Sequence, residues 1–432
     1  MTARLAIGLV GLGNVGSALV RLLEDRSRDI ERTQGLRIEI VRAAVRQPSK
    51  PRGLGLPEGI VGTDALALAR DPKVGCVVEL MGGAEAGEVV TAALDAGKPV
   101  VTANKLLLAE RGEQLFALAA SRQLPLRFEG AVCGGLPIVR LLREALAPDR
   151  VLSLHGILNG TTNYILSRMA DSGASFEDAL AEAQRAGYAE ADPSLDLSGE
   201  DAAQKLCLLA RLAFGARVSP GEVLTEGIRS LTPADLAAAR ELGCVVKLLA
   251  IARRAGSALD LRVHPAMIPA RGPLSSVAGP FNAVLVHSEA LGPTLLSGPG
   301  AGGSCTAEAV LADLVDIGRP GAGGPLRFIP GEVLPLLPRA ELSSSYYLRL
   351  TVDDAPGVLA AVTAALGQRS ISIAALTQRE RREEGRQPVA VVILTHPARE
   401  GAVQAAVSEI DRMPFTRAPA QLIRVETGAP LA

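Results

Sequence analysis

The chain has 432 residues, of which 48% are apolar and 21% are charged, an ordinary composition for a folded enzyme. At about 150 residues per domain, this length predicts two or three domains. A net charge of −1 excludes the basic surface that a nucleic-acid-binding protein needs. No apolar run is long enough to cross a bilayer, and no secretory signal precedes the first predicted strand. We therefore expect a cytoplasmic protein without a membrane partner.

Residues 1–137 alternate between strand-like and helix-like patterns. Short apolar runs predict strands at residues 4–10, 37–45, 75–81 and 98–104. Helical patterns separate these runs. Such alternation is typical of an α/β domain with a doubly wound parallel sheet.

The sequence GLGNVG follows the first predicted strand and opens the first predicted helix. Its Gly11, Gly13 and Gly16 have the spacing of a dinucleotide-binding turn. Gly11 permits the tight turn, Gly13 lets the backbone approach a pyrophosphate, and Gly16 allows the helix to pack closely on the sheet. The helix N-terminus would then face the phosphate charge. The alternative is a plain glycine-rich turn, which the position between strand and helix disfavours.

The end of the second predicted strand bears on the choice of cofactor. NAD sites usually place Asp or Glu there to bind the ribose 2′-hydroxyl. This chain instead has RQPSKPR, which begins at Arg46, includes Lys50 and contains no acid. Arg46 therefore predicts NADP, because a cation suits the 2′-phosphate. The alternative is a solvated basic loop, which leaves NAD open as the cofactor.

Beyond residue 137 the pattern changes to longer helices and mixed strands. Residues 138–300 are predicted to form an α+β domain, and a helical run at 301–320 is predicted to return to the first domain. Residues 321–344 are rich in proline and glycine, which predicts a linker. Residues 345–427 then give strands and helices in the order βαββαβ, a ferredoxin-like unit.

A helix predicted from about Ser198 to Ala213 carries the strongest catalytic candidates. Asp201 and Lys205 are four residues apart, so they share one face of this helix. The helix is apolar nearly all round, and charges on a buried helix are costly unless they are paired or functional. These surroundings disfavour the usual alternative, a surface ion pair. An acidic stretch just upstream, which includes Glu190, could bind a substrate ammonium group or be a solvated loop.

Several longer segments carry a family resemblance. VVTANKLLLA, NGTTNYIL, GYAEADPSLDLSGEDAAQK and GPGAGG follow GLGNVG in this order. Together they resemble homoserine dehydrogenase over essentially the full chain, and the last unit resembles the ACT domain of many bacterial members. The resemblance implies NAD(P)-dependent, reversible interconversion of L-homoserine and L-aspartate 4-semialdehyde in threonine, methionine and isoleucine biosynthesis. It implies a Rossmann domain at 1–137, a catalytic and dimerisation domain at 138–300, and an ACT domain at 345–427.

The resemblance also implies roles for individual residues. Lys205 would donate the proton to the carbonyl oxygen, and Lys105 would lie between nicotinamide and substrate. Glu190 and Asp201 would hold the amino end of the substrate. The implied cofactor-binding residues are Gly11, Gly13, Asn14, Val15, Gly16, Arg46, Lys105 and Gly303. The segment FEGAVCGGLP resembles the sodium site of the family, in which oxygen ligands suit a hard cation. Its ligands would be Glu129 and the backbone carbonyls of Val132, Gly134 and Leu136.

Two positions depart from the family pattern. Asn14 stands where threonine is common, which leaves the glycine frame intact, and Cys305 stands where proline is common after GPGAGG. The second departure bears on the nicotinamide contact expected from Gly303.

The ACT resemblance implies a threonine effector and assembly into a homodimer or homotetramer. The alternative is a unit that only mediates assembly.

Two related enzymes fit less well. Phosphoglycerate dehydrogenase would have a mid-chain glycine motif and a histidine base, and aspartate-semialdehyde dehydrogenase would need a cysteine nucleophile. Cys133 is the one cysteine in a loop-like setting. A sensor protein without activity is disfavoured because the implied catalytic residues are intact.

Overall fold

The computed structural model describes residues 2–50, 52–83, 85–319, 324–325, 334–378 and 388–427. The predicted linker at 321–344 falls partly outside these ranges, at residues 321–323 and 326–333. The chain divides into two compact units, one formed by Met1–Val151, Ala202–Val223 and Phe281–Leu334, the other by Leu152–Asp201, Leu224–Pro280 and Pro335–Ala432. Among the described residues, no helix combines the length and the apolar character needed to span a membrane.

The first unit is built on a six-stranded parallel sheet with the order β3-β2-β1-β4-β5-β6. Its strands are β1 (Ala3–Val10), β2 (Leu36–Ala44), β3 (Val61–Gly62), β4 (Cys76–Glu79), β5 (Val100–Thr102) and β6 (Leu126–Arg127). This is the strand order of dinucleotide-binding folds, which bind their ligand beyond the carboxyl ends of the central strands. The predicted doubly wound sheet is therefore confirmed.

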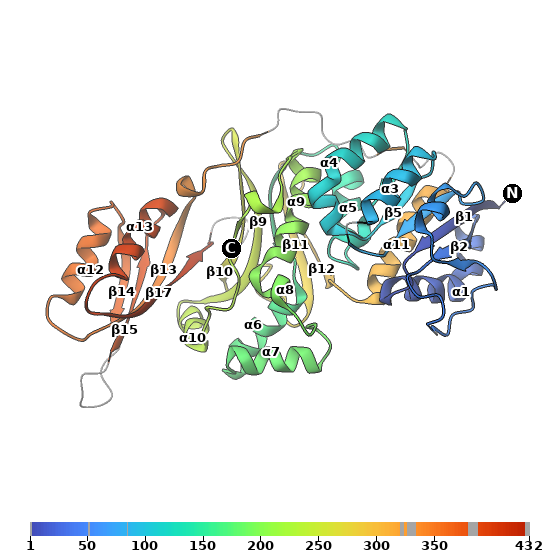
Figure 1. Ribbon diagram of the computed structural model, residues 1–432. Coiled ribbons are helices and arrows are strands. Elements are labelled where there is room, and N and C mark those ends of the chain that lie inside the picture. The colour runs from blue at the N-terminus through green and yellow to red at the C-terminus, as the bar shows by residue number, and fades with distance from the viewer. Residues whose placement is uncertain are drawn as a thin grey trace. The chain divides into compact units, whose positions relative to one another are not determined.

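Helices and a hairpin complete the first unit. They are α1 (Asn14–Gln34), α2 (Ala65–Arg70), α3 (Ala86–Asp95), α4 (Lys105–Ser121), α5 (Ile138–Arg140), α11 (Gly303–Gly318), β11 (Phe281–Ser288) and β12 (Gly292–Pro299). Helix α11 comes late in the chain but lies beside α1 (Figure 1). Its Ala307, Val310 and Leu314 are fully buried and belong to the same apolar core as Leu9 and Leu19. The late helical segment thus folds with the N-terminal sheet.

The second unit contains a sheet with the order β7-β9-β10-β17-β13-β15-β14. The strands are β7 (Val151–Ile157), β9 (Cys244–Ala255), β10 (Ala258–Pro269), β13 (Ser343–Val352), β14 (Ile373–Gln378), β15 (Val389–Thr395) and β17 (Thr416–Val425), with β8 (Leu224–Thr225) paired to β10 and β16 (Ala398–Arg399) paired to β13. Strands β9 and β10 form a long antiparallel hairpin. The remaining helices are α6 (Gly160–Ser172), α7 (Phe176–Arg185), α8 (Ser194–Ser198), α10 (Pro233–Glu241), α12 (Val358–Gly367) and α13 (Glu400–Ile410).

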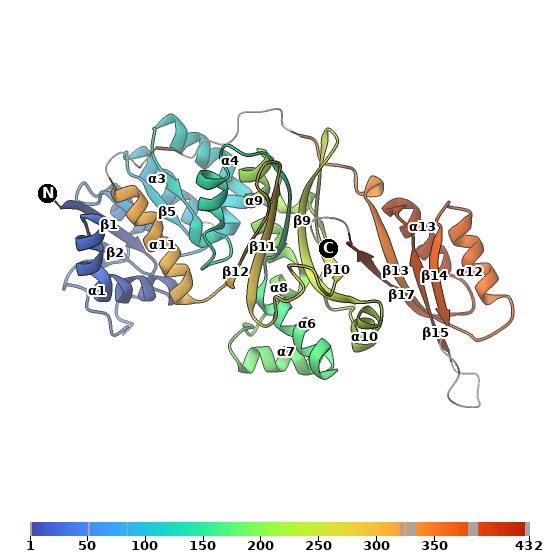
Figure 2. The same ribbon diagram turned by 180° about the vertical axis from the view of Figure 1, so that it is seen from behind.

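The C-terminal part of this unit has the predicted βαββαβ order, with β13, α12, β14, β15, α13 and β17 in sequence. Helices α12 and α13 lie on one face of the antiparallel strands (Figure 2). Their apolar residues share a core with the strands, which includes Leu348, Val362, Ile393 and Val407. Strand β17 also pairs in parallel with β10, through Ala266 opposite Arg424 and its neighbour. The ferredoxin-like sheet therefore continues into the β9–β10 hairpin, a connection that the sequence does not reveal.

Helix α9 (Glu200–Phe214) begins in the second unit and ends in the first. The predicted start at Ser198 is wrong by two residues, because Gly199 has a φ of 86° and ends α8 in the left-handed conformation. Glycine takes this conformation without steric cost, so α8 and α9 are separate helices joined by a tight turn.

Candidate active site

The glycine-rich turn leaves the end of β1 and enters α1. Gly11 has a φ of 99°, and a Cβ on it would lie 2.6 Å from the carbonyl oxygen of Leu80. A Cβ on Gly16 would lie 2.1 Å from the carbonyl oxygen of Gly11. Gly13 differs, since nothing lies within 4 Å of its would-be Cβ. Packing within the chain thus requires the first and third glycines, while the second faces open space that a phosphate group could approach.

A second helix N-terminus lies beside this turn. A Cβ on Gly303, the first residue of α11, would lie 3.0 Å from the carbonyl oxygen of Asn14. Val15 follows Asn14 in the first turn of α1. The ends of α1 and α11 therefore bring two sets of N-terminal backbone amides to one place, an arrangement that favours a bound anion. The thiol of Cys305 donates to the carbonyl of Ala301 at 3.2 Å.

Arg46 lies at the same edge of the sheet. The amide of Gly11 donates to the carbonyl of Ala44, the last residue of β2, at 2.9 Å. Arg46 follows two residues later and is exposed. The guanidinium of Arg52 donates to the carbonyl of Gln47 at 2.9 Å, which closes the basic loop on itself. A cation is thus available close in the fold to the glycine-rich turn.

Lys105 begins α4 in a loop that an internal network holds in place. The carboxylate of Glu79, which is fully buried, accepts from the hydroxyl of Thr102 at 2.6 Å. That hydroxyl accepts from the amide of Asn104 at 3.0 Å, and the side chain of Asn104 caps α4. The Nδ2 group of Asn104 is buried and has no hydrogen-bond partner among the described residues. Sequence reasoning missed Glu79 and Asn104, although an Asn before a helix signals a cap.

The predicted cation loop follows β6. Gly134 has a φ of 46°, and a Cβ on it would lie 2.8 Å from the carbonyl oxygen of Gly300. Cys133 is also in the left-handed region, with a φ of 55°. The carboxylate of Glu129 accepts from the backbone amides of Val139 and Arg140 at 2.9 and 2.8 Å. Each of its oxygens thus already has a partner.

In the described part of the chain no group of three His, Cys, Asp or Glu side chains could hold a metal ion. A cation in this loop would therefore be bound chiefly by backbone carbonyls. Val132 and Leu136, the other two implied ligands, are both buried in the loop.

Two buried carboxyl groups meet beside this loop. The carboxylate of Asp313, on α11, accepts from the backbone amide of Glu129 at 2.8 Å. Burial raises the pKa of Glu129 to about 7, against the effect of its two amide donors. Burial, followed by the negative charge of Glu129, raises the pKa of Asp313 to about 7. Two adjacent carboxyl groups in a site of this kind are easier to ionise when a cation is bound nearby.

Asp201 and Lys205 lie on α9 as predicted. Their exposed fractions are 7% and 8%, and every residue from Asp201 to Ala210 is buried. The expectation of a buried helix is confirmed, and the alternative of a surface ion pair is wrong. A charged pair in these surroundings requires specific partners.

One of those partners is Asn159, which precedes α6 and which sequence reasoning missed. Its Nδ2 donates to Asp201 at 2.9 Å and to Asp196 at 2.7 Å. Its Oδ1 accepts from the amide of Thr162 and so caps α6. A single buried amide therefore orients two carboxylates and starts a helix. The signal in the sequence was the NGTT segment, in which an Asn follows a strand and precedes a helix.

Glu190 lies in the exposed loop between α7 and α8. The hydroxyl of Thr161 donates to the carbonyl of Tyr188 at 2.7 Å and to Asp196 at 3.2 Å. The loop that carries Glu190 is therefore tied to the carboxylate that Asn159 also holds. The side chain of Glu190 itself is exposed rather than packed with Asp201.

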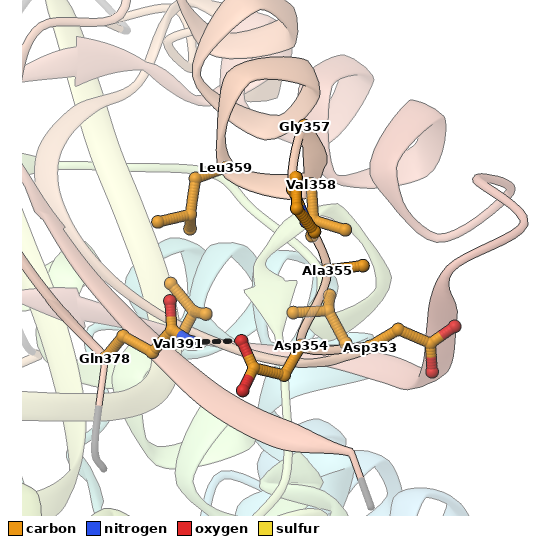
Figure 3. Close-up of a pocket in the computed structure, with 10 residues that line it drawn as sticks. Asp353, Asp354, Ala355, Gly357, Val358, Leu359, Gln378 and Val391 are labelled. Atoms are coloured by element: carbon orange, nitrogen blue, oxygen red, sulfur yellow. Dashed lines mark hydrogen bonds between the residues drawn. The ribbon is translucent and has the colours of Figure 1, made fainter. Parts of the chain in front are cut away.

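A separate cavity of about 170 Å³ lies in the C-terminal part of the chain (Figure 3). It is lined by Val352, Asp353, Asp354, Ala355, Pro356, Gly357, Val358, Leu359, Gln378 and Val391. Gly357 has a φ of 90° and precedes α12, while Gln378 donates to Asp354 at 3.1 Å. Carboxylates and the backbone amides at a helix start are groups that could bind the charged ends of an amino acid.

Comparison with known proteins agrees with this geometry. Residues 137–315 match the family model described as homoserine dehydrogenase, and residues 11–129 match the NAD-binding domain of homoserine dehydrogenase. Residues 346–412 match the ACT domain. The homoserine dehydrogenase of Pseudomonas aeruginosa is 41% identical over 429 residues, which cover 97% of this chain and 98% of the relative.

Solved structures give the same result. The crystal structure of a homoserine dehydrogenase from Thiobacillus denitrificans is 43% identical with a TM-score of 0.91, over 98% of both chains. A hyperthermophilic archaeal homoserine dehydrogenase mutant in complex with NADPH is 28% identical with a TM-score of 0.62, over 72% of this chain and 97% of the other.

Proposed function

The chain belongs to the homoserine dehydrogenase family, and we propose that Lys205 moves the proton in its reaction. The enzyme interconverts L-homoserine and L-aspartate 4-semialdehyde with a nicotinamide cofactor. In reduction, the ammonium group of Lys205 gives a proton to the carbonyl oxygen as that oxygen becomes a hydroxyl. In oxidation, the neutral amine takes the hydroxyl proton. Lysine suits this role because its ammonium group can lose a proton, which guanidinium does not do.

Asp201 and Glu190 are proposed to bind the amino group of the substrate. The observation that carries this assignment is the hydrogen bond of 2.9 Å from Asn159 to Asp201, which fixes a buried carboxylate one helical turn from Lys205. An oriented carboxylate binds an ammonium group without first having to be ordered. Lys105, half-buried at the start of α4, is proposed to lie between substrate and nicotinamide.

A nicotinamide cofactor fits the residues of the first unit. The open space at Gly13 and the unpartnered Nδ2 of Asn104 are features that a bound dinucleotide would use. Gly11, Gly13, Asn14, Val15, Gly16, Arg46, Lys105 and Gly303 would hold it. A nicotinamide held by these residues would supply or accept the hydride that the substrate carbon gains or loses. We propose NADP as the preferred form, because Arg46 replaces the acidic residue that would repel a 2′-phosphate.

We propose a sodium ion in the loop after β6, bound by Glu129 and by the backbone carbonyls of Val132, Gly134 and Leu136. Support comes from the left-handed backbone at Gly134 and from the buried carboxyl pair of Glu129 and Asp313, which a cation would stabilise in its charged form. The ion would hold this loop, and with it the start of α11, in one conformation.

We propose that the ACT domain binds threonine in the cavity beside Asp354 and Gly357, and that ACT domains pair between chains in a dimer or tetramer. Strand β14 is at one edge of its sheet and carries the exposed Leu376, a surface that a second copy could cover. The competing proposal is that the ACT domain only mediates assembly. It also predicts that ACT domains pair between chains, but it predicts no binding of threonine.

The experiment for the whole proposal is a set of initial rates with L-homoserine, measured with NADP and with NAD, in sodium and in choline salts, with and without threonine. We expect reduction of the cofactor, faster at limiting NADP than at limiting NAD. Failure to oxidise L-homoserine with either cofactor would overturn the proposed mechanism as a whole.

A further inference from the structure

An ion pair joins the last strand of the ACT domain to the segment after β8. Arg424, on β17, donates to both carboxylate oxygens of Glu226, from Nη1 at 2.7 Å and from Nη2 at 2.8 Å. The side chain of Arg424 is 1% exposed, whereas that of Glu226 is 37% exposed. Two parallel hydrogen bonds between guanidinium and carboxylate fix both distance and orientation.

The position of Arg424 is set within the ACT domain. Its Nε and Nη2 donate to Glu400, the first residue of α13, at 2.8 and 2.6 Å. Glu400 also accepts from the hydroxyl of Tyr346 at 2.9 Å. Tyr346 is the register partner of Arg424 on β13, and the far end of β13, Val352, lines the cavity beside Gly357. A rearrangement of β13 or α13 would therefore move Arg424.

Glu226 begins a segment that packs without spare room against α8. The amide of Ile228 donates to the carbonyl of Leu197 at 3.0 Å. A Cβ on Gly227 would lie 2.1 Å from that same carbonyl oxygen and 2.8 Å from the Cα of Ser198. Because these atoms are already in close contact, a displacement of Glu226 would also displace the end of α8.

Two carboxylates lie on either side of the turn that ends α8. Asp196 lies in α8, and Asp201 lies in the first turn of α9. Gly199 joins the two helices, and a Cβ on it would lie 3.2 Å from the carbonyl oxygen of Glu226. Asn159 holds both carboxylates from the other side. The turn is thus held between Asn159 and the Glu226 segment.

We propose that Arg424 is a positioning residue for substrate binding, which acts through Glu226 and the α8–α9 turn on Asp201. The ACT domain would in this way set the affinity for the amino end of the substrate without changing the affinity for the cofactor. The proposal rests on the proposed role of Asp201 in binding substrate, and it holds whether or not threonine is an effector.

A second ion pair from the ACT domain provides a matched control. Arg349, on β13, binds both oxygens of Asp235 through Nε at 2.7 Å and Nη2 at 3.1 Å. Asp235 belongs to α10, where it forms a capping box with Thr232. This pair also attaches the ACT domain to the rest of its unit, but it does so through Asp235 on α10 and not through Glu226. Loss of either pair should weaken attachment, whereas only loss of the first should disturb Asp201.

The test compares Glu226→Gln, Glu226→Asp and Arg424→Lys with Arg349→Lys in the full-length enzyme. We expect Glu226→Gln to raise the KM for homoserine about fivefold or more, the range of a typical coupling between sites. The KM for NADP should stay within about twofold. Glu226→Asp, which keeps the charge, should recover part of the loss. Glu226 is half-exposed, so its variant tests the proposal even if Arg424→Lys fails to fold.

Two results would overturn the proposal: an unchanged KM for homoserine in Glu226→Gln, or an equal rise in Arg349→Lys, which would reveal a merely structural attachment. Asp201→Asn separates this failure from failure of the proposed function. If Asp201→Asn leaves the KM for homoserine unchanged, the role of Asp201 is wrong. If Asp201→Asn raises it and Glu226→Gln does not, only the positioning role of Arg424 is wrong.

Discussion

Asn159 donates a hydrogen bond of 2.9 Å to Asp201, a residue 42 positions later in the chain. Asp201 is 7% exposed and Asn159 is 4% exposed, so water does not compete strongly for this contact. A buried carboxylate without such a donor would lose much of the stabilisation of its charge. The hydrogen bond therefore orients Asp201, as a group that binds a substrate ammonium must be oriented.

Asn159→Ala should raise the KM for homoserine and destabilise the protein by about 1–3 kcal/mol, because it leaves buried carboxylates without their donor. Asn159→Ser should keep part of the cap on α6, since serine also caps helices, but should lose the amide donor. Unfolding midpoints and KM values of the two variants separate the effects. If Asn159→Ser binds homoserine as well as the unmodified enzyme, the orienting role is wrong.

Arg46→Ala should raise the KM for NADP by about tenfold or more, because a hydrogen bond to a charged group contributes about 1.5–3 kcal/mol. The KM for NAD should change little, since NAD has no 2′-phosphate. The variant thus serves as its own control when both cofactors are measured. An equal effect on both would mean that Arg46 only supports the loop, and Lys50→Ala would then be the next variant to compare.

The burial of Lys247 leads us to predict that the free energy of unfolding depends on pH. Lys247 is 5% exposed and donates to Asn163 at 3.0 Å and to the Val277 carbonyl at 2.6 Å. Burial lowers the pKa of Lys247 from 10.5 to about 8. Between pH 8 and 10.5 the native lysine is neutral while the unfolded one is protonated. The unfolded state then binds more protons, so the free energy of unfolding rises with pH in this window, by up to about 3 kcal/mol.

The check on this prediction is urea unfolding at pH 7.5, 8.5 and 9.5. Lys247→Met should lose this part of the rise, whereas Lys73→Met, at an exposed position, should keep it. The same pH dependence in Lys247→Met and in the unmodified protein would show that Lys247 keeps an ordinary pKa.

Sodium should stabilise the protein relative to choline at equal ionic strength. A ligand present at a hundred times its Kd stabilises the native state by about 2.7 kcal/mol. Gly134→Ala should abolish this difference, because its Cβ would clash with Gly300 in the loop. Gly97→Ala is the matched control, with a φ of 76° and nothing within 4 Å of the new Cβ. Equal thermal midpoints in sodium and choline would remove the support for the cation site.

Much of the fold follows from local sequence patterns. Alternating strands and helices, and the glycines around Gly11, predict the parallel sheet and its turn, since these depend on residues a few positions apart. The burial of α9 is predicted by its apolar composition around Asp201 and Lys205. The βαββαβ order of the C-terminal unit is likewise confirmed.

The contacts that orient the site could not be predicted in this way. Asn159 and Asp201 meet only after the chain has folded, as do Glu129 and Asp313, which are 184 residues apart. The pairing of β17 with β10 involves two residues on each strand and leaves no periodic pattern. Glu129 was expected as a cation ligand, and its carboxylate also accepts two backbone amides at the start of α5, contacts that depend on packing.

The proposed role of Lys205 is tested most directly by the turnover of Lys205→Met with saturating homoserine and NADP. A general acid–base group contributes about 10²–10⁴-fold, so kcat should fall by about this factor. Binding of NADPH, followed by its fluorescence, should be retained, and Lys205→Arg should be similarly slow because guanidinium keeps its proton. A kcat within about threefold of the unmodified enzyme, well short of the general acid–base contribution, would contradict the assignment.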